Sequence, residues 1–370
     1  MEPGHAGETE AQAADRHVGE LMAELRVALL GYGLAGAVFH GPLIASVAGL
    51  RLAAVVTANP ERAAQAAREH PGVVVLDAPE RVWQRAGELD LAVVATPNRT
   101  HGPLTLAALD AGLPVVVDKP MAVDAAEGQE LVDRARARGL LLTVFQNRRW
   151  DGDLLTLRRL LDDGALGRVH RFESRFERWR PVPKPGWRES GGPEEAGGLL
   201  NDLGSHLVDQ ALHLFGPAAQ VYGELDRRRP GMRVDDDAFV ALTHASGVRS
   251  HLWMSAVAAR LGPRLRVLGE RAAYVKYGLD GQEDALRMGE RPDRPGWGEE
   301  PPERWGVVGT EEQASPVRTE PGAYQRFYEG LAAALRGEGP PPVDPADAVA
   351  ALRVLDAARR SATEGAAAPA

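Results

Sequence analysis

A glycine-rich turn lies between an apolar, strand-like run and a helix-like stretch near the start of the chain. The turn is Gly31-Tyr32-Gly33-Leu34-Ala35-Gly36, and it directly follows the apolar run Arg26–Leu30. In such a turn the first glycine permits a tight bend, the second lets the backbone approach a pyrophosphate, and the third lets the helix pack on the strand. The N–H groups at the start of the helix attract phosphate charge. The same glycine spacing also occurs in turns that bind no ligand, but the strand before this turn and the helix after it favour a bound dinucleotide.

Short apolar runs alternate with amphipathic stretches from about residue 25 to residue 146. The expected strands are Arg26–Leu30, Leu52–Thr57, Val73–Leu76, Leu91–Thr96, Val115–Val117 and Leu141–Phe145. The expected helices are Ala35–Ala48, Pro60–Glu69, Pro79–Ala86, His101–Ala111 and Ala125–Arg138. Continuous apolar strands separated by helices predict an α/β Rossmann domain, with a doubly wound parallel sheet buried on both faces.

The pattern changes after Phe145, where short turns replace most of the helices between strand-like runs. The expected strands are Val169–Trp179, Ala238–His244, Val248–Ser255, Leu265–Leu268 and Ala272–Lys276, and the expected closing helices are Ala323–Ala334 and Pro345–Ser361. Clustered hairpins predict an α+β C-terminal domain with a largely antiparallel open sheet. The Pro- and Gly-rich segment 281–321 is either a structured excursion or an interface element.

The expected organisation is a mobile tail over residues 1–23, a dinucleotide-binding domain over 24–146 and a substrate-binding and dimerisation domain over 147–370. The net charge of −9 argues against a general nucleic-acid binder, and the absence of cysteine excludes disulfides, thiolate zinc sites and cysteine nucleophiles. No apolar run approaches the roughly 18–20 residues that span a bilayer, and the first residues lack the basic and apolar regions of a signal peptide. We therefore expect a cytoplasmic protein without a nucleic-acid or membrane partner.

The end of the second predicted strand bears on the choice of cofactor. An Asp or Glu there would bind the ribose 2′-hydroxyl of NAD, but the run ends in Thr57-Ala58-Asn59, without an acid. Arg62 follows at the start of the next helix, where a guanidinium suits the 2′-phosphate of NADP. The pattern favours NADP, while NAD remains the alternative because Thr57 and Asn59 could serve it and Arg62 could be a solvated helix residue.

The fourth predicted strand runs into Thr96-Pro97-Asn98-Arg99-Thr100-His101 at the carboxyl edge of the sheet. Ligands of open α/β sheets bind along this edge, so Thr96 and Asn98 are expected to support the cofactor. His101 either supports the cofactor as well or only begins the next helix.

A lysine follows the fifth predicted strand, again at the carboxyl edge of the sheet. In Asp118-Lys119-Pro120, the lysine could hold a hydroxyl or a developing alkoxide beside a nicotinamide, and the proline could fix the turn through a cis bond. The alternative is that Lys119 is an ordinary surface lysine that follows a strand and has no role in a site.

Acidic and histidine side chains recur in the stretch that follows Gly197-Gly198, a pair of glycines that suits close approach of a ligand to the backbone. Asp202 and His206 lie four residues apart, and therefore on one helical face, which Asp209 and His213 continue. Such a stripe is typical of a metal site. However, the apolar neighbours of His213 favour a core histidine, and a nicotinamide enzyme needs only an acid–base group and a polar clamp. We therefore expect no metal.

From Leu25 onward the chain resembles the glucose–fructose oxidoreductase/inositol dehydrogenase/MocA (Gfo/Idh/MocA) family. The resemblance is carried by Gly31–Gly36, Val38–Ile44, Thr96–His101, Asp118–Pro120 and Gly197–Asp209, with Asp-Lys-Pro in place of the family's usual Glu-Lys-Pro. Three further stretches resemble a branch that includes NADP-dependent scyllo-inositol dehydrogenases: Gln146–Asp151, Gly186–Glu189 and Tyr277–Asp284.

The resemblance implies an NAD(P)-dependent oxidoreductase with a catalytic set of Lys119, Asp202 and His206. His206 would take the proton from a secondary hydroxyl as hydride passes to the nicotinamide. Lys119 would steady the alkoxide, and Asp202 would bind a substrate hydroxyl or orient the pair. The implied substrate is a cyclic polyol or sugar, and the implied assembly is a homodimer or homotetramer.

Two arginines and two tryptophans are candidates for the substrate pocket: Arg148, Trp150, Trp187 and Arg188. Tryptophan offers an apolar face to a sugar ring and arginine offers donors to hydroxyls, whereas core packing and surface ion pairs are the alternatives. A non-catalytic, cofactor-sensing regulatory protein is the second function considered. The presence of all three implied catalytic residues disfavours it.

Overall fold

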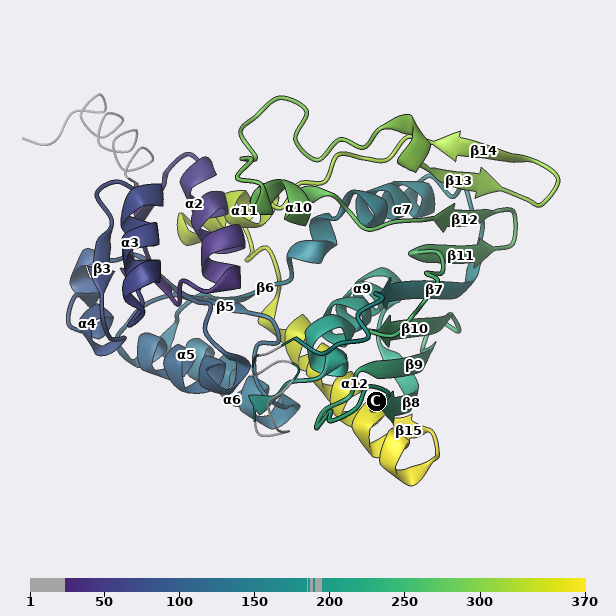
Figure 1. Cartoon of the computed structure of the whole chain (residues 1–370), viewed down its shortest axis with the longest axis horizontal. Helices are drawn as coiled ribbons and strands as arrows, with labels where there is room; N and C mark the ends of the chain where they lie inside the picture. The colour runs from purple at the N-terminus through teal and green to yellow at the C-terminus, as the bar shows by residue number, and fades with distance from the viewer. Residues whose placement is uncertain (1–23, 185, 187–188, 190–194) are drawn as a thin grey trace, which may run out of the picture.

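The computed structural model describes residues 24–184, 186, 189 and 195–370. Two β-sheets lie side by side, each with helices packed against it (Figure 1). The expected mobile tail, residues 1–23, lies outside the described residues. Within the described part of the chain, no helix combines the length and the apolar character that crossing a membrane requires.

The first sheet holds six parallel strands in the order β3-β2-β1-β4-β5-β6. They are β1 (Leu25–Leu30), β2 (Leu50–Val56), β3 (Val74–Leu76), β4 (Leu91–Val94), β5 (Val115–Asp118) and β6 (Leu142–Phe145). All of β4 and β6 is buried, as a parallel sheet covered on both faces requires. The predicted doubly wound fold is confirmed. Its strand order reverses between β1 and β4, the position at which ligands of such sheets bind.

The helices of this half are α2 (Gly41–Ser46), α3 (Pro60–Glu69), α4 (Glu80–Trp83), α5 (His101–Asp110) and α6 (Ala125–Arg138). The expected helix Ala35–Ala48 begins as a π-helical turn, Ala35–His40, which continues into α2. The boundaries of α6 follow from its ends: the Asp124 side chain accepts from the Glu127 N–H, and Gly139 ends the helix with a φ of +64°.

The second sheet holds nine strands in the order β14-β13-β12-β11-β7-β10-β9-β8-β15. They are β7 (Val169–Glu177), β8 (Ala218–Asp226), β9 (Asp237–His244), β10 (Arg249–Ser255), β11 (Leu265–Gly269), β12 (Ala273–Lys276), β13 (Gly306–Gly309), β14 (Ala314–Val317) and β15 (Ala368–Pro369). Only the β7–β10 pair is parallel, so the expected largely antiparallel sheet is confirmed, including its two hairpins.

The segment 281–321 is a structured excursion that contains α10 (Gln282–Arg287) and the hairpin of β13 and β14. Its two tryptophans make hydrogen bonds within the segment: Trp297 Nε1 donates to Gln282 Oε1 at 3.2 Å, and Trp305 Nε1 donates to the Glu300 carbonyl oxygen at 3.1 Å. Of the two interpretations of this segment, the structure supports the structured excursion.

Two helices, α11 (Gln325–Leu335) and α12 (Pro345–Glu364), connect the two halves. The helix α9 (Ser205–Phe215) belongs to the second half. The helix α12 packs on β8 and α9 of the second half and on α6 of the first, and α11 packs on α2. These contacts hold the two halves together, and the cavity described below is lined by residues of both.

Candidate active site

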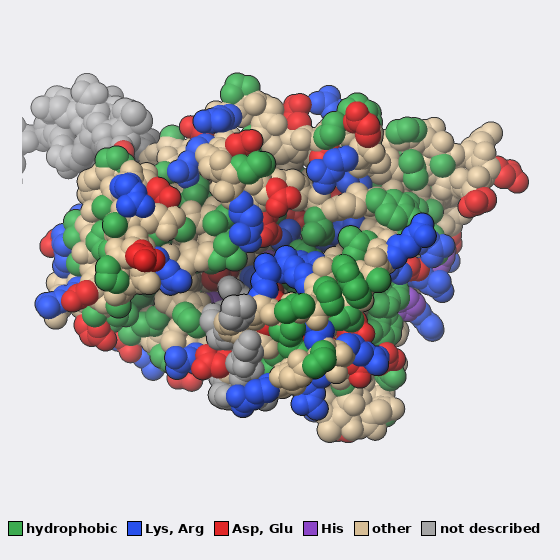
Figure 2. Space-filling view, in the orientation of Figure 1, with side chains coloured by type: hydrophobic (Ala, Val, Ile, Leu, Met, Phe, Trp, Pro, Cys, Tyr) green, Lys and Arg blue, Asp and Glu red, His purple; other side chains and the backbone are tan. Residues whose placement is uncertain are grey.

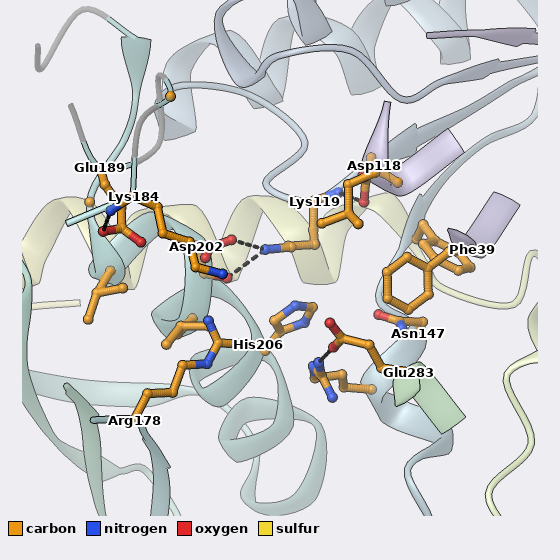
Figure 3. A pocket seen from close by; sticks show the side chains of 18 of the residues that line it. Phe39, Asp118, Lys119, Asn147, Arg178, Lys184, Glu189, Asp202, His206 and Glu283 are labelled. Atoms are coloured by element: carbon orange, nitrogen blue, oxygen red, sulfur yellow. Dashed lines mark hydrogen bonds and ion pairs between the residues drawn. The ribbon is translucent and has the colours of Figure 1, made fainter. Parts of the chain in front are cut away.

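A cavity of about 340 Å³ is lined by residues from both halves of the molecule. The first half contributes the helix start after β1 and the turns after β5 and β6. The second contributes the end of β7, the start of α9 and α10. Lys and Arg side chains gather around this hollow (Figure 2), and Figure 3 shows how the labelled side chains face it. Its volume lies in the range of about 300–1,000 Å³ typical of small-ligand sites.

Lys119 projects into the cavity from the turn that follows β5 (Figure 3). Its backbone N–H donates to Asp118 Oδ1 at 2.8 Å, and the peptide bond to Pro120 is cis, as the sequence suggested. Lys119 Nζ donates to the carbonyl oxygen of Asp202 at 2.5 Å and to its Oδ1 at 3.1 Å. The structure thus brings together two of the three residues that the resemblance implied as catalytic.

His206 lines the same cavity from the first turn of α9. Its side chain is 6% exposed, and its Nδ1 has no hydrogen-bond partner among the described residues. Burial, and then the positive charge of Lys119 and of three arginines, holds the pKa of the imidazole well below its usual range. His206 is therefore neutral at pH 7 and can accept a proton.

The start of α9 is preceded by a π-helical turn, Leu200–Gly204, which contains Asp202. Asp235 fixes this turn, because its carbonyl oxygen accepts from the Leu199 N–H at 3.0 Å and its Oδ2 accepts from the Leu200 N–H at 2.7 Å. A Cβ on Gly198, whose φ is +89°, would collide with the Asp235 carboxylate. From the sequence we expected a ligand to approach the backbone at this glycine. In the structure the group that approaches it is the carboxylate of Asp235.

The expected stripe of acids and histidines does not converge on one point. Asp209 turns away from the cavity and pairs with Arg149, whose Nε and Nη2 donate to its two carboxylate oxygens at 2.9 and 2.6 Å. His213 is exposed, so the prediction of a core histidine is wrong: at the end of α9 the ring reaches solvent beside its apolar neighbours. Within the described ranges, no group of three or more His, Asp or Glu side chains could hold a metal ion.

The glycine turn after β1 has the shape that a dinucleotide requires. Gly31 has a φ of +97°, and a Cβ there would lie 2.6 Å from the Ala95 carbonyl oxygen. A Cβ on Gly36 would collide with the carbonyl oxygen of Gly31. By contrast, a Cβ on Gly33 would meet only Arg62 Nη1, at 3.7 Å, so the space above Gly33 is open to a ligand. Leu34 and Ala35 continue this surface into the cavity.

The residues after β2 surround the same turn. Asn59 caps α3, since its Oδ1 accepts from the Arg62 N–H at 3.0 Å, and Thr57 Oγ1 accepts from the Asn59 N–H at 3.3 Å. The guanidinium of Arg62 stands exposed beside Gly33. Tyr32 is buried and donates to Glu69 Oε2 at 2.6 Å, so its side chain anchors the turn to α3.

The polar residues after β4 tie loops together. His101 is buried between two carbonyl oxygens, with Nδ1 2.7 Å from that of Pro120 and Nε2 2.9 Å from that of Thr96. Asn98 Nδ2 donates to the carbonyl oxygen of Ala196 at 2.9 Å. His101 therefore supports the turn that carries Lys119, and Asn98 links the first half to the segment before α9.

Of the four predicted substrate residues, the structure places one in the cavity wall and one away from it, and it does not describe the other two. Arg148 is buried in the cavity wall, where its Nη2 donates to Glu283 Oε2 at 2.7 Å. The ring of Trp150 packs edge-on against Phe327, and this residue is not among those that line the cavity. Trp187 and Arg188 lie outside the described residues.

Several wall residues escaped the sequence analysis, among them Phe39, Glu283, Arg178 and Arg180. Arg178 and Arg180 stand two residues apart at the end of the predicted strand Val169–Trp179, and that spacing is the signal that could have placed them on one side of it. Glu283 carries no local signal, because it reaches Arg148 across 135 residues of chain.

Comparison with known proteins assigns both halves of the chain to one family of oxidoreductases. Residues 25–146 match the family described as "Oxidoreductase family, NAD-binding Rossmann fold", and residues 158–369 match its "C-terminal alpha/beta domain". The chain is 41% identical to the Escherichia coli oxidoreductase YdgJ, over 91% of this chain and 96% of that protein. It is 33% identical to the scyllo-inositol 2-dehydrogenase (NADP(+)) IolW of Bacillus subtilis, over 92% and 94%. A solved structure, the Bacillus subtilis oxidoreductase yvaA, superposes with a TM-score of 0.89 at 32% identity and covers 94% of this chain and 99% of its own. The chain therefore belongs to the Gfo/Idh/MocA family of NAD(P)-binding oxidoreductases.

Proposed function

We propose that the protein is an NADP-dependent dehydrogenase that acts on a secondary hydroxyl of a cyclic polyol or sugar. One observation carries this proposal: Lys119, held by Asp202, lines the same small cavity as a buried and neutral His206. The name of the Bacillus subtilis relative, a scyllo-inositol 2-dehydrogenase, supports the substrate class. Two relatives that match a smaller part of the chain are named an inositol 2-dehydrogenase and a D-glucoside 3-dehydrogenase, and these names agree with the same substrate class.

The bound nicotinamide supplies the acceptor or donor of hydride for the substrate carbon. The open backbone at Gly33, Leu34 and Ala35 would hold the pyrophosphate at the helix start. Thr96 and Asn98 would support the cofactor indirectly, because their side-chain hydrogen bonds hold the loops next to the cofactor site.

In oxidation, His206 would accept the proton of the substrate hydroxyl, because its depressed pKa keeps a ring nitrogen unprotonated. Lys119 would donate a hydrogen bond to the same oxygen as negative charge develops on it. Asp202 holds the ammonium of Lys119 in place and could also accept from a neighbouring substrate hydroxyl. In ketone reduction the same groups would act in reverse.

The preference for NADP rests on Arg62. No acid ends β2, and the exposed guanidinium beside Gly33 suits a 2′-phosphate. The B. subtilis relative carries NADP(+) in its name. NAD is the alternative cofactor, bound through Thr57 and Asn59.

We further propose a cytoplasmic homodimer or homotetramer, formed through the open face of the second sheet. Burial alternates along β9, and the less buried side presents Phe239 next to His251 and Trp253 of β10. Light scattering would determine the assembly, and a monomer at micromolar concentration would contradict it.

The activity is tested by screening polyols and sugars with NADP and with NAD, and by following the absorbance of the reduced nicotinamide. The expected result is turnover with at least one cyclic polyol or sugar, abolished by His206→Ala and by Lys119→Ala. Tight cofactor binding without turnover of any substrate would instead favour the second candidate, a non-catalytic sensor of NAD(P).

A further inference from the structure

The acidic side chains that line the cavity are matched by basic ones. Glu283 accepts from Arg148 at 2.7 Å and from Arg287 at 2.8 Å. Asp202 pairs with Lys119 at 3.1 Å. Both carboxylates are therefore already engaged by basic side chains.

Two further arginines of the cavity wall, Arg178 and Arg180, have no such match. Both are half-buried, and neither side chain makes a hydrogen bond or an ion pair within the part of the chain that the structure describes. Burial lowers the pKa of Arg178, and the charges of Arg180 and Arg148 lower it further, whereas the negative charges of Asp202 and Glu283 oppose this shift. The wall thus holds two guanidinium groups that no acidic side chain of the described residues contacts directly.

The backbone aims both arginines at the cavity. They follow β7 in an extended segment, in which alternate side chains point to the same side. Trp179, between them, is 56% exposed and belongs to the opposite side. The segment is held by the N–H of Arg178, which donates to the Ser255 carbonyl oxygen at 2.8 Å, and by that of Arg180, which donates to the Ala256 carbonyl oxygen at 2.7 Å.

An aromatic ring fixes Arg178 in this place. Its Cζ lies 4.9 Å from the centroid of Phe176, and Cζ of Arg148 lies 4.8 Å from the same centroid. Two guanidinium groups on one ring repel each other, although the ring itself attracts each of them, and of the two only Arg148 is contacted by Glu283. The arrangement is therefore suited to a ligand that brings negative charge.

We infer that the substrate carries an anionic group, a carboxylate or a phosphate monoester, which Arg178 and Arg180 bind. Guanidinium groups bind both anions through paired hydrogen bonds, so the two arginines would hold the charged end while a hydroxyl of the substrate faces Lys119 and His206. This inference rests on the proposed function and narrows its substrate class from neutral polyols to acidic ones.

The test compares D-glucose with D-glucuronate and D-glucose 6-phosphate as probes, in the presence of NADP. Binding is measured by calorimetry and by the shift in Tm, and turnover by nicotinamide absorbance. We expect wild type to bind at least one anionic probe at least 10-fold more tightly than glucose. Arg178→Gln and Arg180→Gln should each weaken that binding about 10- to 100-fold and weaken the binding of glucose by a much smaller factor. The two anionic probes distinguish a carboxylate from a phosphate.

Arg171→Gln is the matched control, because Arg171 is an exposed arginine of β7 away from the cavity, and it should bind the probes as wild type does. Equal binding of neutral and anionic probes by wild type would overturn the inference. So would loss of NADP affinity in the Arg178 and Arg180 variants, because the arginines would then bind the cofactor. Faster turnover of the neutral sugar than of either anionic probe would overturn the inference alone and leave the proposed dehydrogenase intact. Tight anion binding without any turnover would support the anion site and overturn the proposed dehydrogenase.

Discussion

The ammonium group of Lys119 donates hydrogen bonds to both the backbone carbonyl oxygen and the carboxylate of Asp202. The pair joins the turn after β5 to the π-helical turn before α9, and so links the two halves of the molecule at the cavity wall. After burial, Lys119 is the largest influence that lowers the pKa of the neighbouring His206. The lysine thus helps burial to keep the histidine neutral and also holds the carboxylate of Asp202.

The first prediction follows from that influence. Replacing Lys119 with Met removes a positive charge beside the imidazole, so the pKa of His206 should rise toward its usual value. The imidazole resonances of the full-length protein, followed by NMR across a pH titration, measure this shift. His244 is the internal control, because its pKa is lowered by burial without any contribution from Lys119. An unchanged or lower pKa of His206 in the variant would contradict the charge model.

The second prediction separates two glycines of the turn after β1. Gly33→Ala adds a methyl group to open space, so the free energy of unfolding should stay within about 0.5 kcal/mol of wild type, while NADP affinity falls at least 10-fold. Gly36→Ala drives a methyl group into the Gly31 carbonyl oxygen and should destabilise the fold by about 1–3 kcal/mol. Urea unfolding and cofactor titration distinguish the two effects. Equal destabilisation by both variants would show that neither position is reserved for a ligand.

The elements that the sequence revealed are those with a strong local pattern. The strands β1, β4 and β5 are continuous apolar runs because both faces of the sheet are covered, and such runs stand out against the helices between them. The hairpin of β9 and β10 was visible because alternating strands flank a short turn.

Other elements depend on contacts that no local pattern encodes. The strand β14, Ala314–Val317, is short, mostly exposed and contains Pro316, so only its pairing with β13 makes it a strand. The π-helical turns at Ala35–His40 and Leu200–Gly204 read as ordinary helix in the sequence. At the site, Lys119, Asp202 and His206 came from motifs, whereas Glu283 was placed by a long-range ion pair.

The third prediction concerns the choice between NADP and NAD. Arg62→Ser removes the guanidinium beside Gly33, and loss of a charged hydrogen bond to the 2′-phosphate should raise the KM for NADP about 10- to 100-fold. The KM for NAD should change less than threefold, since NAD lacks this phosphate. Arg68→Ser, an exposed arginine at the end of the same helix, is the matched control. Equal effects of Arg62→Ser on both cofactors would rule out a 2′-phosphate site at this residue.

The fourth prediction is a loss of stability in acid. Buried His206 resists protonation in the folded state, whereas in the unfolded chain it binds a proton at a pKa of about 6.5. Below pH 6.5 the unfolded state therefore binds more protons, and the free energy of unfolding falls as the pH falls, by at most about 1.4 kcal/mol per pH unit for one group. His206→Gln should flatten this dependence when urea unfolding is measured between pH 7 and 5. A slope identical to that of wild type would place the acid sensitivity elsewhere, for example at buried His101.

The fifth prediction tests the ion pair that supports α9 from behind the cavity. Arg149 and Asp209 are both nearly inaccessible and share two hydrogen bonds, while Asp347 contacts the same guanidinium from a half-exposed position. Asp209→Asn leaves a buried charge without its main partner and should lower the free energy of unfolding by about 3 kcal/mol. Asp347→Asn, the matched control, should cost less than about 1 kcal/mol because solvent screens that pair.

If burial is the reason for the difference, replacing both Arg149 and Asp209 with Leu should recover part of the lost stability, since no buried charge is then left without a partner. A double variant no more stable than Asp209→Asn in urea unfolding would mean that the geometry of the pair, and not its desolvated charge, supports the helix that carries His206.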